Sequence, residues 1–500
     1  MCGICGIVNY NDRKVDKKVI KKMTKAMIHR GPDDDGSVII KNFSIGMRRL
    51  AIIDLEKGQQ PISNSDNSIW VVLNGEIYNH IELRNELKKK GHIFKTKSDT
   101  EVLVHLYQEF SFEFLDRING MFSFALIDKK NEIVWIVRDR LGIKPLYYVD
   151  TKENFIFSSD LKSIKKITDV TIDHSEILKY LGMSYIPAPK TIFREIKKLL
   201  PAHYIVIRGK KIIEKRYWDL PERTTWEGGF KRAKATLLEL LNDSIKLRFR
   251  SDVPVGLFLS GGIDSSGLVA LAAKLGYEDI NTFTVNFLGK KGKDDFFANI
   301  VSKQYGTNHE TIEFDLKNFK KELDELIPFL DEPIADSAIV PTYYLSKIAR
   351  SQGIKVLLSG AGGDEIFGGY SRYFKPKIFS PRWIAENLPA SLRYIFRNIL
   401  HYLHPQRSTR AISPEISYAL ECSGADLHFF YQIIKDKKIM DDILTSMNEN
   451  FLSLNDNINY SYTNIRMRID IKNYLLDNIL SLTDKSTMAT SVEGRVPFLD

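Results

Sequence analysis

Short apolar runs separated by turn residues dominate the chain up to about residue 160. They are rich in β-branched and aromatic residues and read SIWVVLNGE, GMFSFALID, EIVWIVRD, PLYYVD and NFIFSSD. Runs of this kind, bounded by turn residues, are typical of β-strands. We therefore expect a largely antiparallel sheet in this part of the chain.

Two helices are predicted among these strands. Residues 15–27 place Val19, Ile20 and Met23 on one apolar face and lysines on the other, as an amphipathic helix requires. The second helix lies within KSDTEVLVHLYQEF, where Ser98 and Glu101 have the spacing of a capping box.

From about residue 228 the pattern changes to strand-like runs that are followed by helices. VPVGLFLSGG precedes SSGLVALAAKLG, and INTFTVNF and GIKVLLSGAGGDE come later. This alternation favours a parallel sheet covered by helices. The polar stretch DLPERTTWEGG, residues 219–229, is the expected linker. After residue 370, SPRWIAENLPASLRYIFRNILHYLHPQRSTR is predicted to be helical and to pack on its own domain rather than on a membrane surface.

Composition indicates a soluble globular protein of two or three domains, with 500 residues, 43% hydrophobic and 27% charged. Three cysteines exclude a disulfide framework and favour a reducing compartment, so we expect a cytoplasmic protein. No apolar run is long enough to span a membrane. The net charge of +9 is modest, and aromatic residues do not interleave with the basic ones, so nucleic-acid binding is not favoured.

The stretch FLSGGIDSS, residues 258–266, has the features of an anion site. A buried strand ends there, a turn without obstructing side chains follows, and two serines open a helix, so backbone N–H groups converge on one point. Asp264 facing phosphates makes sense with Mg²⁺ between them. Its competing structural role is that of a helix cap.

Two further stretches are expected at the same site. VLLSGAGGDEIFGGY, residues 356–370, is another apolar run and glycine-rich loop, with Asp364 and Glu365. Loops at the carboxyl ends of parallel strands face one crevice, where open α/β sheets bind ligands. LDEPIADSAIVPTYYL, residues 330–345, adds Asp331, Glu332 and Asp336, which we expect in that crevice.

Cys2 and Cys5 allow three different chemistries. A C-x-x-C pair can be a redox couple or half of a metal site. Alternatively, removal of Met1 makes Cys2 the N-terminus, and its α-amine, with an ordinary pKa of about 7.7–8.0, can take the thiol proton. That arrangement needs no histidine.

MCGICGI, HRGPDDDG, RRLAIIDLEKGQQPI, LNGEIYNH, KSDTEVLVHLY, GMFSFALID and RDRLGIKPLYY resemble, in this order, the glutaminase domain of class II glutamine amidotransferases. SGGIDSS resembles the PP-loop of ATP pyrophosphatases. With DEPIADSAIVPTYYL, LSGAGGDEIFGGY and TDKSTMATSVEGRVPFLD, essentially the whole chain is identified as a member of the glutamine-hydrolysing asparagine synthetase family.

The resemblance implies a chain of mixed α/β and α+β class. Residues 1–218 would form an N-terminal nucleophile hydrolase, a four-layer αββα sandwich. Residues 219–229 would be the linker, and residues 230–500 a parallel-sheet α/β PP-loop domain with added helices. Because VEGRVPFLD stops at Asp500, we expect the C-terminal part of the family domain to be absent.

For the first domain the resemblance implies a glutamine site. Cys2 would attack the carboxamide to form a thioester, and Asn74 and the Gly75 N–H would form the oxyanion hole. The expected glutamine-binding residues are Arg49, Ile52, Asn74, Glu76 and Asp99, with Arg49 on the α-carboxylate and Glu76 and Asp99 on the α-ammonium. Structural roles compete: Arg49 as a surface ion pair and Asp99 as a first-turn residue of a helix.

For the second domain the resemblance implies an ATP and Mg²⁺ site. Aspartate would attack the α-phosphate to give β-aspartyl-AMP, and ammonia that travels through an internal tunnel would displace AMP. Asp264 and Asp364 are the expected Mg²⁺ ligands. The expected ATP-binding residues are Leu257, Ser260, Gly261, Gly262, Asp264, Ser265, Ser266, Val285, Ser359 and Gly360.

One position departs from the family pattern S-G-[DE]-G-x-D-E, because this chain has Ala361 where a carboxylate usually stands. The acceptor therefore stays open: aspartate is the default, and a sugar uronate of surface-polysaccharide synthesis is the alternative. A redox or metal-binding regulator using Cys2 and Cys5, and a nucleic-acid-modifying PP-loop protein, are the remaining hypotheses. The expected partners are glutamine, ATP and the carboxylate, with no nucleic acid and no membrane span; a homodimer is left open.

Overall fold

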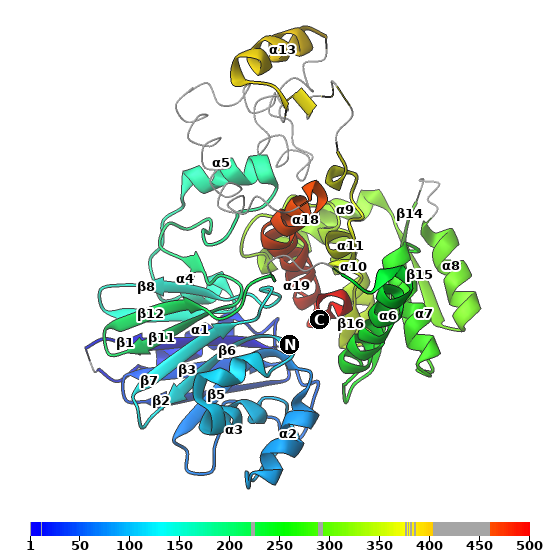
Figure 1. The fold of residues 1–500 in the computed structure, drawn as a ribbon. Coiled ribbons are helices and arrows are strands. Elements are labelled where there is room, and N and C mark those ends of the chain that lie inside the picture. Colours follow the sequence, from blue (N-terminus) through cyan, green and yellow to red (C-terminus); the bar gives the residue numbers. More distant parts are fainter. Residues whose placement is uncertain are drawn as a thin grey trace.

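The computed structural model describes residues 2–11, 13–221, 226–288, 294–375, 387–403 and 461–500, together with residues 378, 380, 383 and 384. Figure 1 shows a first domain of sheets and a second domain of helices around a sheet, with α18 (Tyr462–Lys472) and α19 (Ser481–Met488) between them. Cys422, part of the predicted linker and part of the helical region after residue 370 lie outside the described residues. Among the described residues, no helix combines the length and the apolar character that crossing a bilayer requires.

The first domain contains two six-stranded antiparallel sheets. The first sheet has the order β10-β8-β9-β1-β3-β2 and the second β12-β11-β7-β6-β5-β4. The strands of the first sheet are β1 (Gly3–Asn9), β2 (Asp34–Ile40), β3 (Phe43–Arg49), β8 (Tyr147–Asp150), β9 (Asn154–Ser158) and β10 (Lys197–Lys198). Those of the second are β4 (Ile62–Ser63), β5 (Ile69–Ile77), β6 (Gly120–Asp128), β7 (Ile133–Arg138), β11 (His203–Arg208) and β12 (Lys211–Arg216).

Helices cover the outer faces of both sheets. On the first sheet α1 (Lys17–Ala26) and α4 (Leu161–Lys165) close an outer core, and on the second sheet α2 (His80–Lys89) and α3 (Glu101–Phe110) close another. A third core lies between the two sheets. The predicted αββα sandwich, with its expected strands and helices, is confirmed. A further helix, α5, spans His174–Met183.

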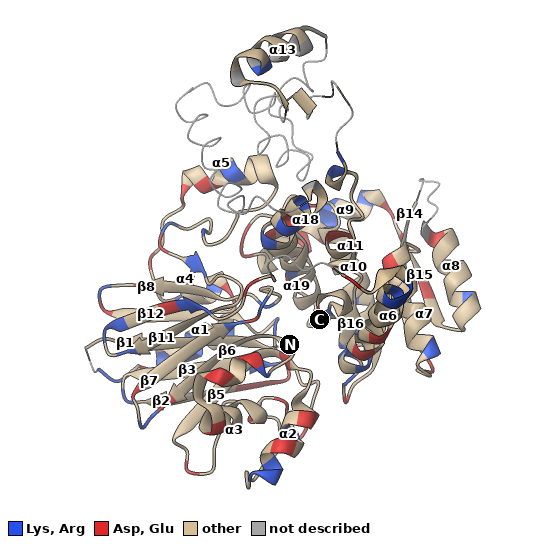
Figure 2. Cartoon of the chain, viewed as in Figure 1, with Lys and Arg blue, Asp and Glu red and all other residues tan. Residues whose placement is uncertain are grey.

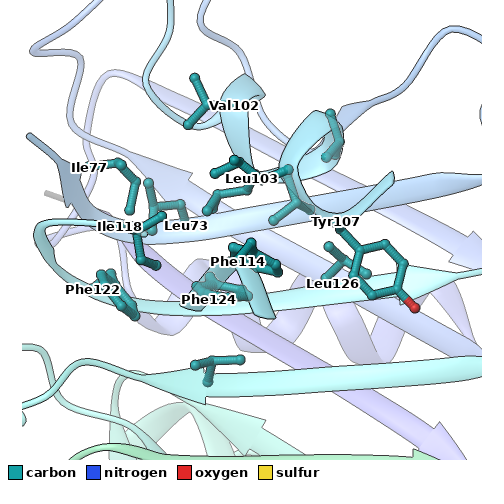
Figure 3. Close-up of a cluster of buried hydrophobic side chains, with 14 of the residues drawn as sticks. Leu73, Ile77, Val102, Leu103, Tyr107, Phe114, Ile118, Phe122, Phe124 and Leu126 are labelled. Atoms are coloured by element: carbon teal, nitrogen blue, oxygen red, sulfur yellow. The ribbon is translucent and has the colours of Figure 1, made fainter. Parts of the chain in front are cut away.

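Alternation along the strands explains how the sequence builds these layers. In β5, Val71 and Leu73 belong to the outer core, whereas Val72 belongs to the core between the sheets. Successive side chains of a strand point to opposite faces, so a strand buried on both sides is apolar at nearly every position. Figure 3 shows Leu73 and Ile77 beneath α3, which contributes Leu103 to the same outer core.

The second domain is built on a parallel five-stranded sheet of order β15-β14-β13-β16-β17. Its strand order changes direction between β13 and β16, and ligands bind at such switch points. The strands are β13 (Val255–Phe258), β14 (Asn281–Phe287), β15 (Asn308–Phe314), β16 (Val356–Leu358) and β17 (Glu493–Arg495). The further helices are α6 (Gly229–Arg248), α7 (Ile263–Lys274), α8 (Asp294–Tyr305), α9 (Phe319–Leu326), α10 (Ile339–Ser351), α11 (Gly363–Phe367), α13 (Ala390–Leu403) and a π-helix (Leu475–Leu480).

Two local predictions were wrong. The capping box does not form: Ser98 Oγ accepts from Thr100 N, and Glu101 accepts from the N–H groups of Lys95 and Thr96. The helix starts only at Glu101, so Ser98 lies too early to cap it. In the second domain, α7 already begins at Ile263, ahead of the two serines that were expected to open it.

The first domain inserts a loop into the core of the second. Leu50 and Ile52, which follow β3, pack with Leu257, Leu259 and Leu268 in one buried cluster. The Ile52 carbonyl accepts from Asp252 N at 2.9 Å. The two domains therefore share an apolar core and do not merely touch at their surfaces.

Two candidate active sites and the interface between them

Cys2 and Cys5 lie on opposite faces of the first sheet. Cys2 belongs to the core between the sheets, together with Ile4, and the residue is 5% exposed. Cys5 belongs to the outer core beneath α1, together with Ile7, and is fully buried. Both are free cysteines. Strand alternation thus separates the thiols, and the spacing C-x-x-C does not produce a pair.

Both backbone polar groups of Cys2 are held by buried side chains. Its N–H donates to Asn74 Oδ1 at 3.2 Å, and its carbonyl accepts from Arg30 Nε at 3.2 Å. Asn74 is fixed in turn, because its Nδ2 donates to Ser159 Oγ at 3.2 Å and to Ser123 Oγ at 3.4 Å. The residue that carries the thiol therefore has a well-defined position.

Gly75, the next residue on β5, cannot carry a side chain. Its φ is +140°, and a Cβ there would lie 2.0 Å from the carbonyl oxygen of Met121 on β6. Only glycine adopts this backbone conformation readily. The two strands therefore approach closely beside Asn74.

Two of the predicted site residues, Arg49 and Glu76, act on the Cys2 thiol, together with Leu50. Burial raises its pKa, while a backbone hydrogen bond from Leu50 and the charge of Arg49 act in the opposite direction, and the charge of Glu76 raises the pKa further. The structure thus brings Arg49 and Glu76 close to Cys2.

Arg49 is not a surface ion pair, because its side chain is buried and donates to backbone carbonyls. Nη2 donates to Asp54 O at 2.7 Å and to Ile53 O at 3.1 Å, which orients the guanidinium. The predicted neighbour Ile52 has its side chain in the core shared with the second domain.

Glu76 and Asp99 form an acidic corner next to this arginine. Burial, and then the charges of Asp99 and Glu493, raise the pKa of Glu76 well above its ordinary value. Glu76 Oε2 is buried and has no hydrogen-bond partner among the residues that the structure describes, whereas Asp99 Oδ2 accepts from Ile77 N at 2.9 Å. The corner already holds one cation, Arg495, whose Nη2 lies 3.6 Å from Glu76 Oε1. Because an unpartnered buried carboxylate oxygen is costly, Glu76 Oε2 suits a second cation such as an ammonium group.

In the second domain the loop after β13 has the geometry of an anion site. Gly261 has a φ of +77°, and Gly262 is the N-cap of α7. Ser265 Oγ accepts from Ser260 N at 3.1 Å and lies 3.0 Å from Ser260 Oγ. These bonds fold the loop back on α7. The first N–H groups of any helix have no intrahelical acceptor, so those of α7 are able to bind an anion.

A cavity of about 960 Å³ lies between this loop and the loop after β16. The predicted residues that line it are Ser260, Gly262, Asp264, Ser265, Val285, Ser359, Gly360 and Asp364. Leu257, Gly261 and Ser266 do not line it: Leu257 lies in the shared core, and Ser266 Oγ is buried without a partner in the described part of the chain.

Asp264 and Asp364 approach one another in the cavity. Burial, and then the negative charge of Asp364, raise the pKa of Asp264. No group of three or more His, Cys, Asp or Glu side chains in the described ranges is arranged to hold a metal ion. Two facing carboxylates fit Mg²⁺ all the same, because that ion is commonly bound by one or two carboxylates together with phosphates.

The prediction for residues 330–345 was only partly right. Asp336 lines the cavity, but Asp331 and Glu332 are buried at the domain interface, where they pair with Lys485 and Lys198. Because isolated buried carboxylates are costly, each needs such a cation, and the chain supplies these cations from distant segments.

Sequence reasoning missed the aromatic wall of the cavity, formed by Phe258, Phe283 and Phe287. On β14, Phe283, Val285 and Phe287 are every second residue, so they line one face of the strand. The two-residue period of a strand could therefore have indicated this wall from the sequence. Within the part of the chain that the structure describes, no lysine or arginine lines this cavity.

The domain interface contains buried ion pairs that sequence reasoning also missed. Arg30 binds Asp484 on α19 through two bonds of 2.9 and 3.1 Å, and the two side chains are 0% and 3% exposed. Lys198 lies 3.1 Å from both Glu332 and Asp477. Figure 2 shows charges of both signs on α18, next to this interface.

Asp160 and Asp331, from opposite domains, also approach each other there. Asp160 Oδ2 and Asp331 Oδ1 are both buried, and His29 Nε2 binds Asp160 Oδ2 at 3.3 Å. Burial, and then the charge of Asp160, raise the pKa of Asp331 to about 7, although the charge of Lys485 opposes this. Burial acts to raise the pKa of Asp160 too, but the His29 bond and Lys485 outweigh burial and lower it.

Comparison with known proteins gives a consistent result over the whole chain. Residues 1–218 match the family model described as "Glutamine amidotransferase domain", and residues 236–500 match the one described as "Asparagine synthase". "Asparagine synthetase (glutamine-hydrolyzing) 1" of Bacillus subtilis is 33% identical over 100% of this chain and 79% of that protein. A Methanocaldococcus jannaschii protein, provisionally named as number 2 of the same enzyme, is 34% identical over 100% of both chains.

The Asp160–Asp331 contact predicts a pH dependence of stability. Because the pKa of Asp331 is raised in the folded state, the folded protein binds this proton more tightly than the unfolded chain, and the free energy of unfolding falls as pH rises from about 4 to about 7. We expect Asp331→Asn to remove this contribution, on the order of 4 kcal/mol over that range. Thermal unfolding midpoints measured between pH 5 and 7.5 should therefore fall less steeply in the variant.

Asp160→Asn serves as the matched partner variant. Removing the Asp160 charge lowers the pKa of Asp331, so in this variant too the unfolding midpoint should depend less on pH. A slope in Asp331→Asn as steep as that of the unmodified protein would contradict the assignment.

Proposed function

Because the chain belongs to the glutamine-hydrolysing asparagine synthetase family, we propose that it transfers the amide nitrogen of glutamine to a carboxylate that ATP activates, with aspartate as the acceptor and asparagine as the product. The family uses ATP, and its two domains support glutamine-dependent amidation. The observation that carries the proposal is the joining, by one buried interface, of a fixed cysteine next to the N-terminus and a glycine-loop cavity that carries facing carboxylates.

In the first site Cys2 is the proposed nucleophile, with its own α-amine as the base once Met1 is removed. Arg49 would bind the α-carboxylate of glutamine, since its guanidinium is already oriented by carbonyls. Glu76 and Asp99 would bind the α-ammonium, which would give Glu76 Oε2 the partner that it lacks. Asn74 and the Gly75 N–H are the proposed oxyanion hole.

In the second site the proposed phosphate contacts are the N–H groups and hydroxyls of the loop after β13. Ser260, Gly262 and Ser265 line the cavity there, and Ser359 and Gly360 face them from the loop after β16. Asp264 and Asp364 would hold Mg²⁺, which supplies charge neutralisation for the phosphates. Val285 belongs to the wall proposed for the adenosine. The ATP-binding residues that line the cavity would be supported from behind by Leu257, Gly261 and Ser266.

The proposed synthetase reaction has two steps. The acceptor carboxylate attacks the α-phosphate of ATP and pyrophosphate leaves, which gives an acyl-adenylate. Ammonia from the first site then forms the C–N bond, the bond from carbon to the AMP oxygen breaks, and one proton is released.

The first domain is proposed as residues 1–218, the linker as 219–229 and the second domain as 230–500; a homodimer and a cytoplasmic location stay predictions.

An apolar cluster between the sites supports internal transfer of ammonia. In the first domain it begins at Met121, the strand partner of Glu76, and it continues through Leu475 and Leu480 of the π-helix. Ala361 and Ile479 pack against this cluster and also line the cavity. Apolar surroundings disfavour the charged form of an amine, so ammonia on this path stays neutral and nucleophilic.

Three predictions test the proposed function, and the first separates the two cysteines. Cys2→Ser should lower glutamine hydrolysis at least about a thousandfold, because the nucleophile is lost, whereas ammonium-driven pyrophosphate release should persist. Cys5→Ser should retain hydrolysis within about twofold and only lower the unfolding midpoint, because a hydroxyl is then buried in an apolar core. Equal loss of hydrolysis in both variants would refute the single-nucleophile assignment.

The second prediction concerns the ammonia path. Ala361→Leu places a larger side chain where the apolar cluster meets the cavity, so the ratio of amide formed to glutamine hydrolysed should fall about tenfold. Ala338→Leu is the matched control, because Ala338 lines the cavity but does not belong to the cluster. An unchanged ratio in Ala361→Leu would place the path elsewhere.

The third prediction concerns the acceptor. With ATP, Mg²⁺ and ammonium, we expect pyrophosphate release that depends on aspartate. A uronate is the alternative acceptor because Ala361 leaves the usual carboxylate of this loop absent. Release with glucuronate or galacturonate and none with aspartate would overturn the asparagine assignment and support amidation of a sugar acid.

A further inference from the structure

Helix α19 lies between the two proposed sites and contacts both. Leu482 and Thr483 line the cavity of the second domain. The next residue, Asp484, points to the first domain and binds Arg30. Consecutive residues of one short helix therefore reach both centres.

Asp484 is connected to Cys2 through a single side chain. Its two carboxylate oxygens accept from Arg30 Nη1 at 2.9 Å and Nη2 at 3.1 Å, and Arg30 Nε donates to the Cys2 carbonyl at 3.2 Å. Arg30 is fully buried and Asp484 is 3% exposed. Two bonds in one plane fix the orientation of a guanidinium better than one bond does.

Arg30 depends on Asp484 for its position. A buried guanidinium is stable only when it is paired and its donors are satisfied. Its three side-chain nitrogens donate to the two Asp484 oxygens and to the Cys2 carbonyl. Lys144, with Nζ 4.0 Å from Asp484 Oδ1, is a second cation facing the same carboxylate.

We propose that Asp484 is a positioning residue for Cys2, and that α19 transmits occupancy of the nucleotide cavity to the cysteine. The proposal rests on the function proposed above. A ligand against Leu482 or Thr483 that prefers one position of α19 also selects the position of Asp484, because the helix moves as a unit. A change in the position of Asp484 would then move Arg30 and, through it, the Cys2 carbonyl.

The test compares Asp484→Asn with the unmodified full chain, with glutamine hydrolysis measured with and without ATP and Mg²⁺. In the unmodified protein we expect ATP with Mg²⁺ to change the rate at least twofold. In Asp484→Asn we expect kcat to fall about tenfold, KM for glutamine to change less than twofold, and the response to ATP to vanish. A fall in kcat without a change in KM separates positioning of the thiol from loss of binding.

Asp477→Asn is the matched control. Asp477 is another buried acid of the same interface, paired with Lys198 at 3.1 Å and with Ala188 N at 2.7 Å, and neither partner touches Cys2. It should lower the unfolding midpoint about as much as Asp484→Asn, yet keep kcat and the response to ATP. This control also covers loss of docking, because weaker docking alone would affect both variants alike.

The outcomes are distinct. A response to ATP that persists in Asp484→Asn, a kcat that does not fall, or an equal loss of kcat in Asp477→Asn would overturn the proposal while glutamine hydrolysis itself remains established. Unmodified protein that hydrolyses glutamine but ignores ATP with Mg²⁺ would also overturn it. Unmodified protein without glutamine hydrolysis would overturn the proposed function, and this inference with it.

Discussion

The structure depends on the buried pair of Arg30 and Asp484. A guanidinium and a carboxylate removed from water cost several kcal/mol each unless their geometry is good and their donors are satisfied. Here two short bonds meet that condition, but the partners come from opposite ends of the chain, 454 residues apart. The first domain alone would leave Arg30 charged and unpaired beside Cys2. Docking of the second domain therefore completes the surroundings of the cysteine.

Apolar contacts make that docking favourable, because buried pairs alone contribute little net stability. Leu50 and Ile52 enter the core of the second domain, and Met121 joins the cluster that reaches Ala361. Leu50 belongs to this apolar contact and also lowers the pKa of the Cys2 thiol through its backbone. The same loop thus joins domain packing to the electrostatics of the site.

Elements that depend on local periodicity were predicted correctly from the sequence, whereas contacts between distant segments were not. Alternation gave the strands of both sheets, and the glycine loops after β13 and β16 were placed correctly at one cavity. The Ser98–Glu101 capping box failed because Glu101 found the backbone of Lys95 and Thr96 instead. Asp331 was misplaced because its partner Lys485 lies in a segment that no local pattern connects with it. Ion pairs across an interface leave no periodic signal.

The charge of the nucleotide cavity constrains how it can select an acceptor. Asp264, Asp336, Asp364 and Glu365 line it, whereas the described residues contribute no lysine or arginine. In the proposed function, Mg²⁺ and the N–H groups of the loops would neutralise the phosphates of ATP. A fixed arginine is the usual reader of a carboxylate, because its fork matches the two oxygens. The described lining offers neutral donors such as Thr342 and Thr483. Neutral donors recognise hydroxyl and amino groups as readily as carboxylates, so in the proposed function these threonines, together with Ala361, would contribute to the choice of the acid that is amidated.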